Sequence, residues 1–332
     1  MHIYLSINLK HIFSIAILSI SFLLPAQNIV HTISKIGNQE VFINSKIEIY
    51  FSSLNNTIDI EYSSPDIPGF CSIVQAEKGR GYIIAEPETK DTGTYVITLN
   101  ANSEIGSAQQ KFSLKVKSIP ESTQLYYIDP INGSDDNIGD YNNPFKTFSK
   151  INASSFNLPG GSIVYLRTGN YGKLVITKLN SSLVYIVAER GNTPGIESLN
   201  FNFSGYWYFS GIHISPLNGD GYYNTNYVSI GGGVQNIHIS NCKIYGEEDI
   251  NNWTTNQDWY DYAGNGIYSL GYNCSFNNNY ILNTYFSVQI SGYNTDVNYN
   301  IIENFGGDAI RGLGNNCNFN FNQIKMQLWM IT

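Results

Sequence analysis

Two residues near the end of the chain have the types and spacing to do chemistry. Arg311 follows Asp308 by three positions, close enough for an ion pair across a short strand and turn, and the only other basic residue after position 250 is Lys325. Elimination across a uronic acid needs a group that neutralises the sugar carboxylate and a base that removes the C5 proton. Arg311 with Asp308 fits this logic in a chain whose net charge of −8 would otherwise repel a polyuronate. The alternative is an Arg–Asp pair that braces a turn.

A segment rich in acids and aromatic residues, residues 246 to 265, precedes this pair. Its acidic and aromatic side chains are Glu247, Glu248, Asp249, Trp253, Asp258, Trp259, Tyr260, Asp261 and Tyr262. Sugars present apolar ring faces and hydroxyl edges, so aromatic platforms beside acids suit a saccharide. Carboxylates also hold calcium. We therefore predict that Trp253, Trp259 and Tyr260 bind substrate and that Asp258 and Asp261 are metal ligands. The alternative is a solvated loop whose aromatic residues cover the structure beneath it.

Two histidines lie in identical four-residue segments of the sequence. The letters IHIS occur at residues 212 to 215 and again at 237 to 240, with His213 and His238 at the same position of each. If the segments occupy neighbouring coils, the two imidazoles would be about 4.8 Å apart. One could then act as a general base, or both could bind substrate or a metal ion. The alternative is a pair of solvated histidines on the face of a sheet.

A repeat in the last third of the chain must position these side chains. Cys274, Phe276, Asn279 and Ile281 recur as Thr295, Val297, Asn300 and Ile302, and then as Cys317, Phe319, Asn322 and Ile324. The steps are 295 − 274 = 21 and 317 − 295 = 22. A period in the low twenties with two-residue alternation is typical of a solenoid of stacked β-coils.

The alternation also predicts which side chains point outward. A residue between two apolar positions of a coil must face outside. We therefore predict one outward column, formed by His213, His238, Ser275, Asp296 and Asn318. The longer step of 274 − 237 = 37 residues predicts a loop that leaves the coil between them.

The first part of the chain has a different pattern. An apolar run from Ile12 to Leu24 follows Lys10 and His11, which predicts a secretory signal peptide over residues 1–27 and therefore an exported protein, secreted or at the cell surface. The run is too short for a membrane span. Residues 28–118 hold short alternating strands that predict a small β-sandwich. Asp91, Gly93 and Tyr95 resemble the tyrosine corner of immunoglobulin-like domains. We interpret this domain as a spacer, with carbohydrate binding as the alternative.

The next segment carries a family resemblance. The residues that carry it are Tyr126, Tyr127, Asp129, Pro130, Gly133, Asp135, Gly139, Pro144, Phe145 and Thr147, followed by a Gly-Gly strand and Gly-x-Tyr over residues 159 to 177. They resemble the opening of secreted right-handed parallel β-helix proteins related to pectate lyases. The resemblance covers about residues 126 to 325 and implies that fold for residues 119–332. It also implies that calcium or a cationic side chain offsets the uronate charge, and that a Lys or Arg acts as the base.

Composition limits the partners. Lys and Arg total 18 against 26 acids, which disfavours nucleic acid or an anionic membrane. Charged residues make up only 13 %, while Tyr and Phe are abundant, as in an all-β protein. Cys274 and Cys317 would be two coils, or about 9.6 Å, apart, which is too far for a disulfide. We expect a monomer with four free thiols.

The repeat stops after Ile324 and Lys325. The remaining letters, MQLWMIT, show no alternation, and a reading frame shifted by one base would permit a further coil. We interpret the end as a frameshift that truncates the β-helix at its C-terminus. Sequencing the locus tests this hypothesis.

These observations combine into one hypothesis. We expect an all-β, exported, polysaccharide-active protein, and we favour a lyase-like enzyme that cleaves uronic-acid glycans by β-elimination. The predicted catalytic residues are Arg311, Asp308 and Asp296, and Glu303 is a further metal ligand, with calcium as the metal. A glycoside hydrolase, which would need two carboxylates facing across a groove, a C5 epimerase and a non-catalytic glycan-binding or adhesin solenoid are the alternatives.

Overall fold

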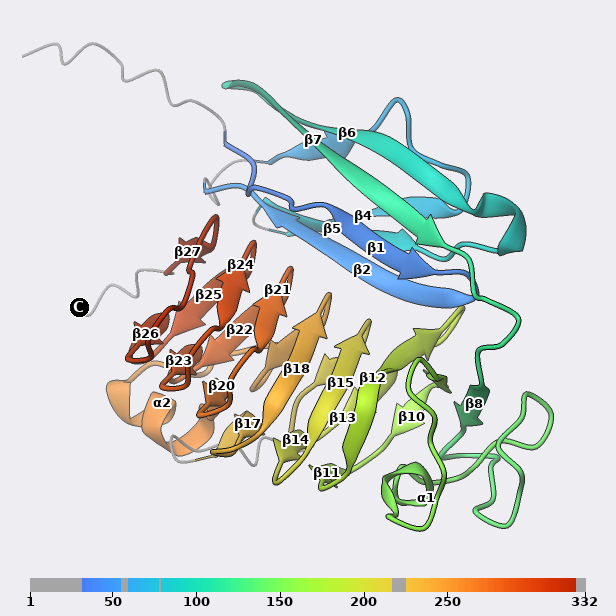
Figure 1. The fold of residues 1–332 in the computed structure, drawn as a ribbon. Helices are drawn as coiled ribbons and strands as arrows, with labels where there is room; N and C mark the ends of the chain where they lie inside the picture. Colours follow the sequence, from blue (N-terminus) through green and yellow to red (C-terminus); the bar gives the residue numbers. More distant parts are fainter. Residues whose placement is uncertain (1–31, 55–58, 78, 217–224, 327–332) are drawn as a thin grey trace, which may run out of the picture. The chain divides into compact units, whose positions relative to one another are not determined.

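The computed structural model describes residues 32–54, 59–77, 79–216 and 225–326 (Figure 1). The predicted signal peptide and all but the first residue of the proposed frameshifted end lie outside them. One compact unit spans His31–Thr332. Within the described ranges the regular elements are nearly all strands, and no helix is both long and apolar enough to cross a membrane.

The first seven strands form two layers, in which the pairs are antiparallel except that β1 pairs parallel with β7. Their bounds are β1 (Gln39–Phe42), β2 (Ser45–Ser52), β3 (Glu61–Ser63), β4 (Cys71–Ala76), β5 (Arg80–Ala85), β6 (Gly93–Ser103) and β7 (Gly106–Lys117). One layer has the order β1-β7-β6-β3 and the other contains β2, β5 and β4. The Tyr95 hydroxyl donates to the carbonyl of Asp91 at 2.9 Å, the hydrogen bond that a tyrosine corner requires.

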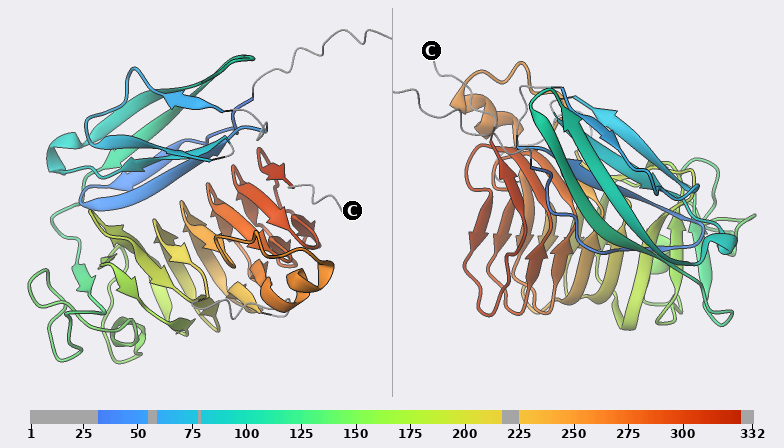
Figure 2. Two further views of the ribbon diagram at one scale, coloured as in Figure 1. Left: turned by 180° about the vertical axis from the view of Figure 1, so that it is seen from behind. Right: turned by 90° about the horizontal axis from the view of Figure 1, so that it is seen from above.

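The rest of the chain winds through three parallel sheets, coil after coil (Figures 1 and 2). The first sheet contains β8 (Leu125–Ile128), β9 (Ile163–Leu166), β12 (Leu179–Glu189), β15 (Gly205–Ser210), β18 (Gln235–Ser240), β21 (Ser275–Asn277) and β24 (Asp296–Asn298). The second contains β10 (Gly169–Asn170), β13 (Pro194–Ile196), β16 (His213–Ile214), β19 (Lys243–Tyr245), β22 (Tyr280–Thr284), β25 (Ile301–Phe305) and β27 (Gln323–Lys325). The third contains β11 (Lys173–Ile176), β14 (Ser198–Phe201), β17 (Asn226–Ile230), β20 (Asn265–Ser269), β23 (Val288–Ile290) and β26 (Ile310–Gly312). Two short helices, α1 (Ser149–Asn152) and α2 (Asn256–Tyr262), lie in connections.

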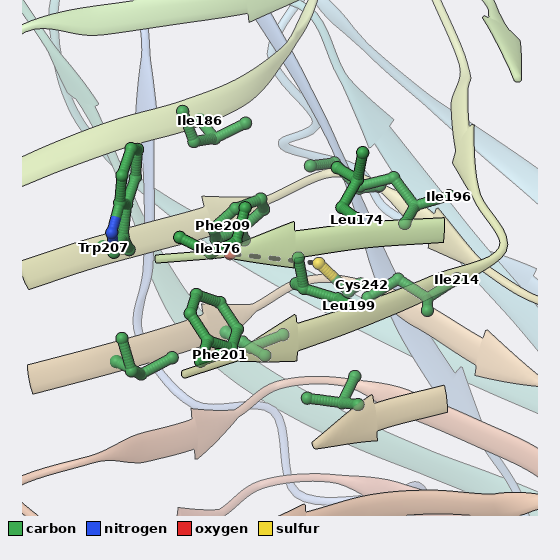
Figure 3. Close-up of a cluster of buried hydrophobic side chains, with 14 of the residues drawn as sticks. Leu174, Ile176, Ile186, Ile196, Leu199, Phe201, Trp207, Phe209, Ile214 and Cys242 are labelled. Carbon is green, nitrogen blue, oxygen red and sulfur yellow. Dashed lines mark hydrogen bonds between the residues drawn. The ribbon is translucent and has the colours of Figure 1, made fainter. Parts of the chain in front are cut away.

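Apolar side chains fill the inside of the coils. Leu174, Ile186, Phe201, Trp207 and Phe209 come from four strands and belong to one buried cluster (Figure 3). The thiol of Cys242 lies among them. All four cysteines are free, as predicted, with Cys242 and Cys274 buried and Cys71 and Cys317 half-buried.

Asparagines hold the turns between the first and second sheets. The side chain of Asn300 donates to the carbonyl of Phe276 and to Oδ1 of Asn322, and its own Oδ1 accepts from the backbone and side chain of Asn279. Asn279, Asn300 and Asn322 are therefore a hydrogen-bonded column along the coil axis. The fixed Asn of the sequence repeat satisfies buried backbone groups that the turns would otherwise leave unpaired.

The register of the last coils agrees with the repeat. His238 pairs with Ser275, Ser275 with Asp296, and Asp296 with Asn318, so these four form an outward column on the first sheet. The prediction that His213 belongs to this column is wrong. His213 lies on the second sheet and pairs with Gly195 and Lys243, while the partner of His238 in the preceding coil is Tyr208.

The sandwich packs directly on the coil. Lys46 and Ser45 of β2 pair antiparallel with Ala188 and Glu189 of β12, which joins β2 to the first sheet. Further contacts reach the second sheet, where Ser52 donates to Glu303 at 2.8 Å and His213 contacts Glu48 at 3.1 Å. The sandwich is thus part of the same compact unit as the coil rather than a detached spacer.

Candidate functional site on the third sheet

The outer face of the third sheet carries a continuous column of polar side chains. Pairing aligns Asn200 with Ser229, Ser229 with Tyr268, Tyr268 with Gln289, and Gln289 with Arg311. Each is only partly buried, while strand neighbours such as Ile267, Val288 and Ile290 are fully buried. Four strand spacings of about 4.8 Å make the column about 19 Å long. Amide, hydroxyl, phenol and guanidinium groups therefore follow one another along an outward face.

Arg311 ends this column and is held in place by two neighbours. Its Nε and Nη2 lie 2.7 and 2.6 Å from Oδ2 of Asp308, and its guanidinium lies 4.3 Å from the centre of the Phe286 ring. The side chains of Arg311 and Asp308 are 37 % and 49 % exposed. The predicted ion pair is therefore present. Because it is exposed, it contributes little to stability and leaves part of the cation available to a ligand.

The loop of residues 246 to 264 joins the second sheet to the third beside this face. Its helix α2 begins with a capping box in which Thr255 accepts from the backbone of Asp258 and the Asp258 carboxylate accepts from Thr255. These hydrogen bonds, from backbone and then side chain, lower the pKa of Asp258. Asp261 accepts from Gln257 at 2.8 Å. Both predicted metal ligands of this loop thus have local partners.

The aromatic residues of the loop divide into two groups. Trp253 and Trp259 are 2 % and 9 % exposed and pack edge to face with centroids 5.0 Å apart. The prediction that their indoles contact substrate directly is therefore wrong, because neither offers a free face; they anchor the loop. Tyr260 is 42 % exposed and packs against Tyr285, which in turn contacts Phe286 beneath Arg311.

Glu303 lies on a different side of the coil. It is 3 % exposed on the second sheet, where Tyr280 and Ser52 donate to it and Arg80 and Lys325 lie within 3.5 and 3.8 Å. The structure does not bring it together with Asp258 or Asp261. In the described ranges no three His, Cys, Asp or Glu side chains are placed to hold a metal ion. Calcium binding stays a prediction.

The remaining predicted residues lie on the first and second sheets. Asp296 is on the first sheet and accepts from Asn318 at 2.8 Å, so the structure separates it from Arg311 and Asp308. His238, also on the first sheet, contacts Ser275 at 2.7 Å. His213 faces the sandwich. The predicted site residues are therefore distributed over all three sheets: Arg311 and Asp308 lie near Tyr260 at the third sheet, while His238 and Asp296 share the outward column of the first.

The sequence prediction missed Asn200, Ser229, Tyr268 and Gln289. Each lies between two buried residues of a strand, which are apolar on both sides of Asn200, Ser229 and Gln289, while Tyr268 lies between Ile267 and the buried Ser269. This alternation indicates that each side chain faces outward. It does not show that the four side chains are aligned, because loops of different length separate the strands of the third sheet and hide their register in the sequence.

Comparison with known proteins adds fold-level likeness only. No protein-family model and no curated protein matches the chain. Among solved structures, titin domain M3 is 11 % identical with a TM-score of 0.22 and covers 26 % of this chain and 96 % of its own. The tandem Ig repeats of Dlar are 13 % identical with a TM-score of 0.23, covering 30 % and 58 %. A GH136 lacto-N-biosidase from Eubacterium ramulus is 12 % identical with a TM-score of 0.32, covering 60 % of this chain and 51 % of that enzyme. The chain thus has immunoglobulin-like structural neighbours, and its activity must be argued from its residues.

Proposed function

We propose that this chain is an exported polysaccharide-active protein, built as a right-handed parallel β-helix, that binds uronic-acid glycans along the outer face of the third sheet. The parallel strands joined by crossovers support the handedness, because such connections are right-handed in nearly all proteins. The observation that carries the functional proposal is the polar column that ends in Arg311, beside the exposed Tyr260.

The face suits a chain of sugars. Its side chains from Asn200 to Gln289 offer hydrogen bonds to hydroxyl groups at regular spacing, and Tyr268 adds an aromatic surface. Arg311 supplies a cation whose planar geometry matches a carboxylate. A uronic acid has both a carboxylate and hydroxyl groups, so one of its residues would bind at Arg311 and its neighbours along the column.

We further propose a lyase-like reaction at this position. Arg311 would neutralise the uronate carboxylate and so make the C5 proton more acidic. A base removes that proton, the electron pair forms the C4–C5 double bond, the C4–O bond breaks, and the oxygen of the leaving sugar takes a proton from solvent. Asp308, which contacts Arg311, is the nearest carboxylate and takes the role of base in this proposal. Calcium could assist through carboxylates of the neighbouring loop.

The test is an assay for unsaturated uronate. Purified protein is incubated with pectate and with alginate, with and without a chelator, and ultraviolet absorbance and reducing ends are followed. We expect absorbance to rise with the wild-type chain and to disappear with Asp308→Asn. Loss of absorbance on chelation would support calcium. New reducing ends without ultraviolet absorbance would instead indicate a hydrolase. If neither signal appears, the chain would be a glycan-binding protein without catalytic activity.

A further inference from the structure

A cavity of about 260 Å³ lies on another side of the coil, between the first sheet and the sandwich. Its floor is the outward column of the first sheet, which pairing extends from Tyr185 through Tyr208 and His238 to Ser275. Phe42 and Lys117 of the sandwich line the opposite side. A cavity of this size accommodates a ligand of about one sugar ring, and a longer glycan would extend from it into solvent.

One end of the cavity is aromatic. Phe42 contacts Tyr185 edge to face with centroids 5.0 Å apart, and Tyr185 contacts Tyr208 at 5.5 Å. The hydroxyl groups of these tyrosines give the aromatic end polar edges. Such surfaces bind ligands that have an apolar face and a polar rim.

The other end offers hydrogen bonds. Nδ1 of His238 lies 2.7 Å from Oγ of Ser275, and in the described part of the chain Nε2 of His238 has no hydrogen-bond partner. Burial lowers the pKa of His238, an effect that the nearby Asp296 partly offsets. A neutral imidazole fixed by Ser275 can donate or accept one hydrogen bond through its second nitrogen.

The charges that border the cavity neutralise each other. Nζ of Lys117 lies 3.2 Å from Glu40 and 4.5 Å from the centre of the Phe42 ring. Glu40 lines the cavity together with Lys117, so the carboxylate and the cation give the cavity no net charge that would favour an acidic ligand. Lys117, His238 and Ser275 are all half-buried, so solvent reaches the cavity.

We propose that this cavity binds a single neutral sugar ring, such as the end of a glycan, at a site separate from the third-sheet face. The ring would pack on the half-buried Tyr185 and Tyr208 while its hydroxyl groups bond to His238 and Ser275. The choice of a sugar among hydroxylated ligands rests on the proposed function. The sandwich then contributes half of a binding site rather than acting as a spacer.

Calorimetric titration of the full chain tests this proposal. The ligands are glucose, galactose, N-acetylglucosamine and galacturonic acid. We expect at least one neutral sugar to bind, and Ser275→Ala to weaken it about 2- to 10-fold, the value of one neutral hydrogen bond. Tyr185→Leu should weaken it too, because it removes one of the aromatic surfaces of the cavity. Ser113→Ala, a serine on the sandwich strand β7 away from the cavity, and Arg311→Gln should leave it unchanged.

Several results would overturn the proposal. They are no binding of any neutral sugar, binding of galacturonic acid alone, or binding that Ser275→Ala and Tyr185→Leu both leave intact. Loss of binding in Arg311→Gln would place the ligand on the third sheet instead. If neutral sugar binds as expected but no polyuronate is bound or cleaved, the proposed function fails while this site stands.

Discussion

The contact between Glu48 and His213 gives the sharpest stability prediction. Glu48 lies on β2 of the sandwich with its side chain only 11 % exposed. His213 of the second sheet lies 3.1 Å away, Lys46 lies at the same distance, and the Tyr50 hydroxyl donates to the same carboxylate. Burial by itself would raise the pKa of Glu48, but the hydrogen bond and charge of His213, with Tyr50 and Lys46, lower it from the usual 4.5 to about 2.

This lowered pKa can be converted into a stability that depends on pH. The ionised form favours folding, so the contribution is complete above the unfolded-state pKa near 4.5 and is lost as the pH falls through about 2. The difference between the two pKa values corresponds to about 3 kcal/mol at pH 7. At pH 3 the same relation gives a contribution of Glu48 to the free energy of unfolding of about 1.4 kcal/mol. Glu48→Gln removes this contribution because its amide does not ionise.

Urea unfolding of the wild type and Glu48→Gln at pH 7 and pH 3 measures the effect. We expect the free energies of unfolding of the two proteins to differ by about 3 kcal/mol at pH 7, and we expect this difference to be about 2 kcal/mol smaller at pH 3. Glu121→Gln, an exposed glutamate with no ion pair among the described residues, should behave as the wild type does. A Glu48→Gln difference that is the same at both pH values would refute the reasoning.

Two further predictions concern the coil itself. Asn300→Ala removes the side chain that bonds to Asn279, Phe276 and Asn322. Because buried groups lose their partners, we expect the free energy of unfolding in urea to fall by about 2 to 3 kcal/mol. The control Asn320→Ala, at an exposed position, should lower it by less than about 0.5 kcal/mol. Equal losses would show that the Asn column does not stabilise the coil. Gly292→Ala would place a Cβ 1.7 Å from the carbonyl oxygen of Gly271, so adjacent coils would have to separate. We expect the melting temperature to fall by more than about 10 °C. An unchanged melting temperature would contradict the close approach of these two backbones.

The regular coils could be predicted because each contributes the same short unit. Ser275 pairs with Asp296 and Asp296 with Asn318, the steps of 21 and 22 that the letters repeat. Between these coils nothing is inserted, so sequence spacing equals spatial register. The tyrosine corner at Tyr95 was predictable for a similar reason, because its hydrogen bond is local.

The position of His213 could not be predicted in this way. Apolar alternation is the same on all three sheets, so the word IHIS does not say which sheet a strand joins. His238 follows its true partner Tyr208 by 30 residues, not 25, because the connection between the second and third sheets is longer in that coil. After an insertion of this kind, the number of residues between two similar segments no longer shows whether the segments pair in neighbouring coils.

The site was partly predictable. Arg311 and Asp308 are close in sequence, so their ion pair follows from local geometry. Glu303 and Asp296 precede Arg311 by only 8 and 15 residues, but each turn between strands moves the chain to another sheet. Glu303 is also bound by Ser52 of the sandwich, more than 200 residues earlier. Contacts between such distant segments leave no local pattern.

Binding of a polyuronate to the full chain tests the central claim most directly. The affinity of wild type, Arg311→Gln and Arg190→Gln for polygalacturonate and alginate is measured at one fixed salt concentration. Arg190 is a matched control, since it is also exposed and paired with a carboxylate, Glu88, at 2.9 Å. We predict that Arg311→Gln weakens binding about 10- to 100-fold, the value of hydrogen bonds to a charged group, and that Arg190→Gln binds as the wild type does. Equal affinity of all three proteins, or no binding by any, would contradict a glycan-binding face on the third sheet.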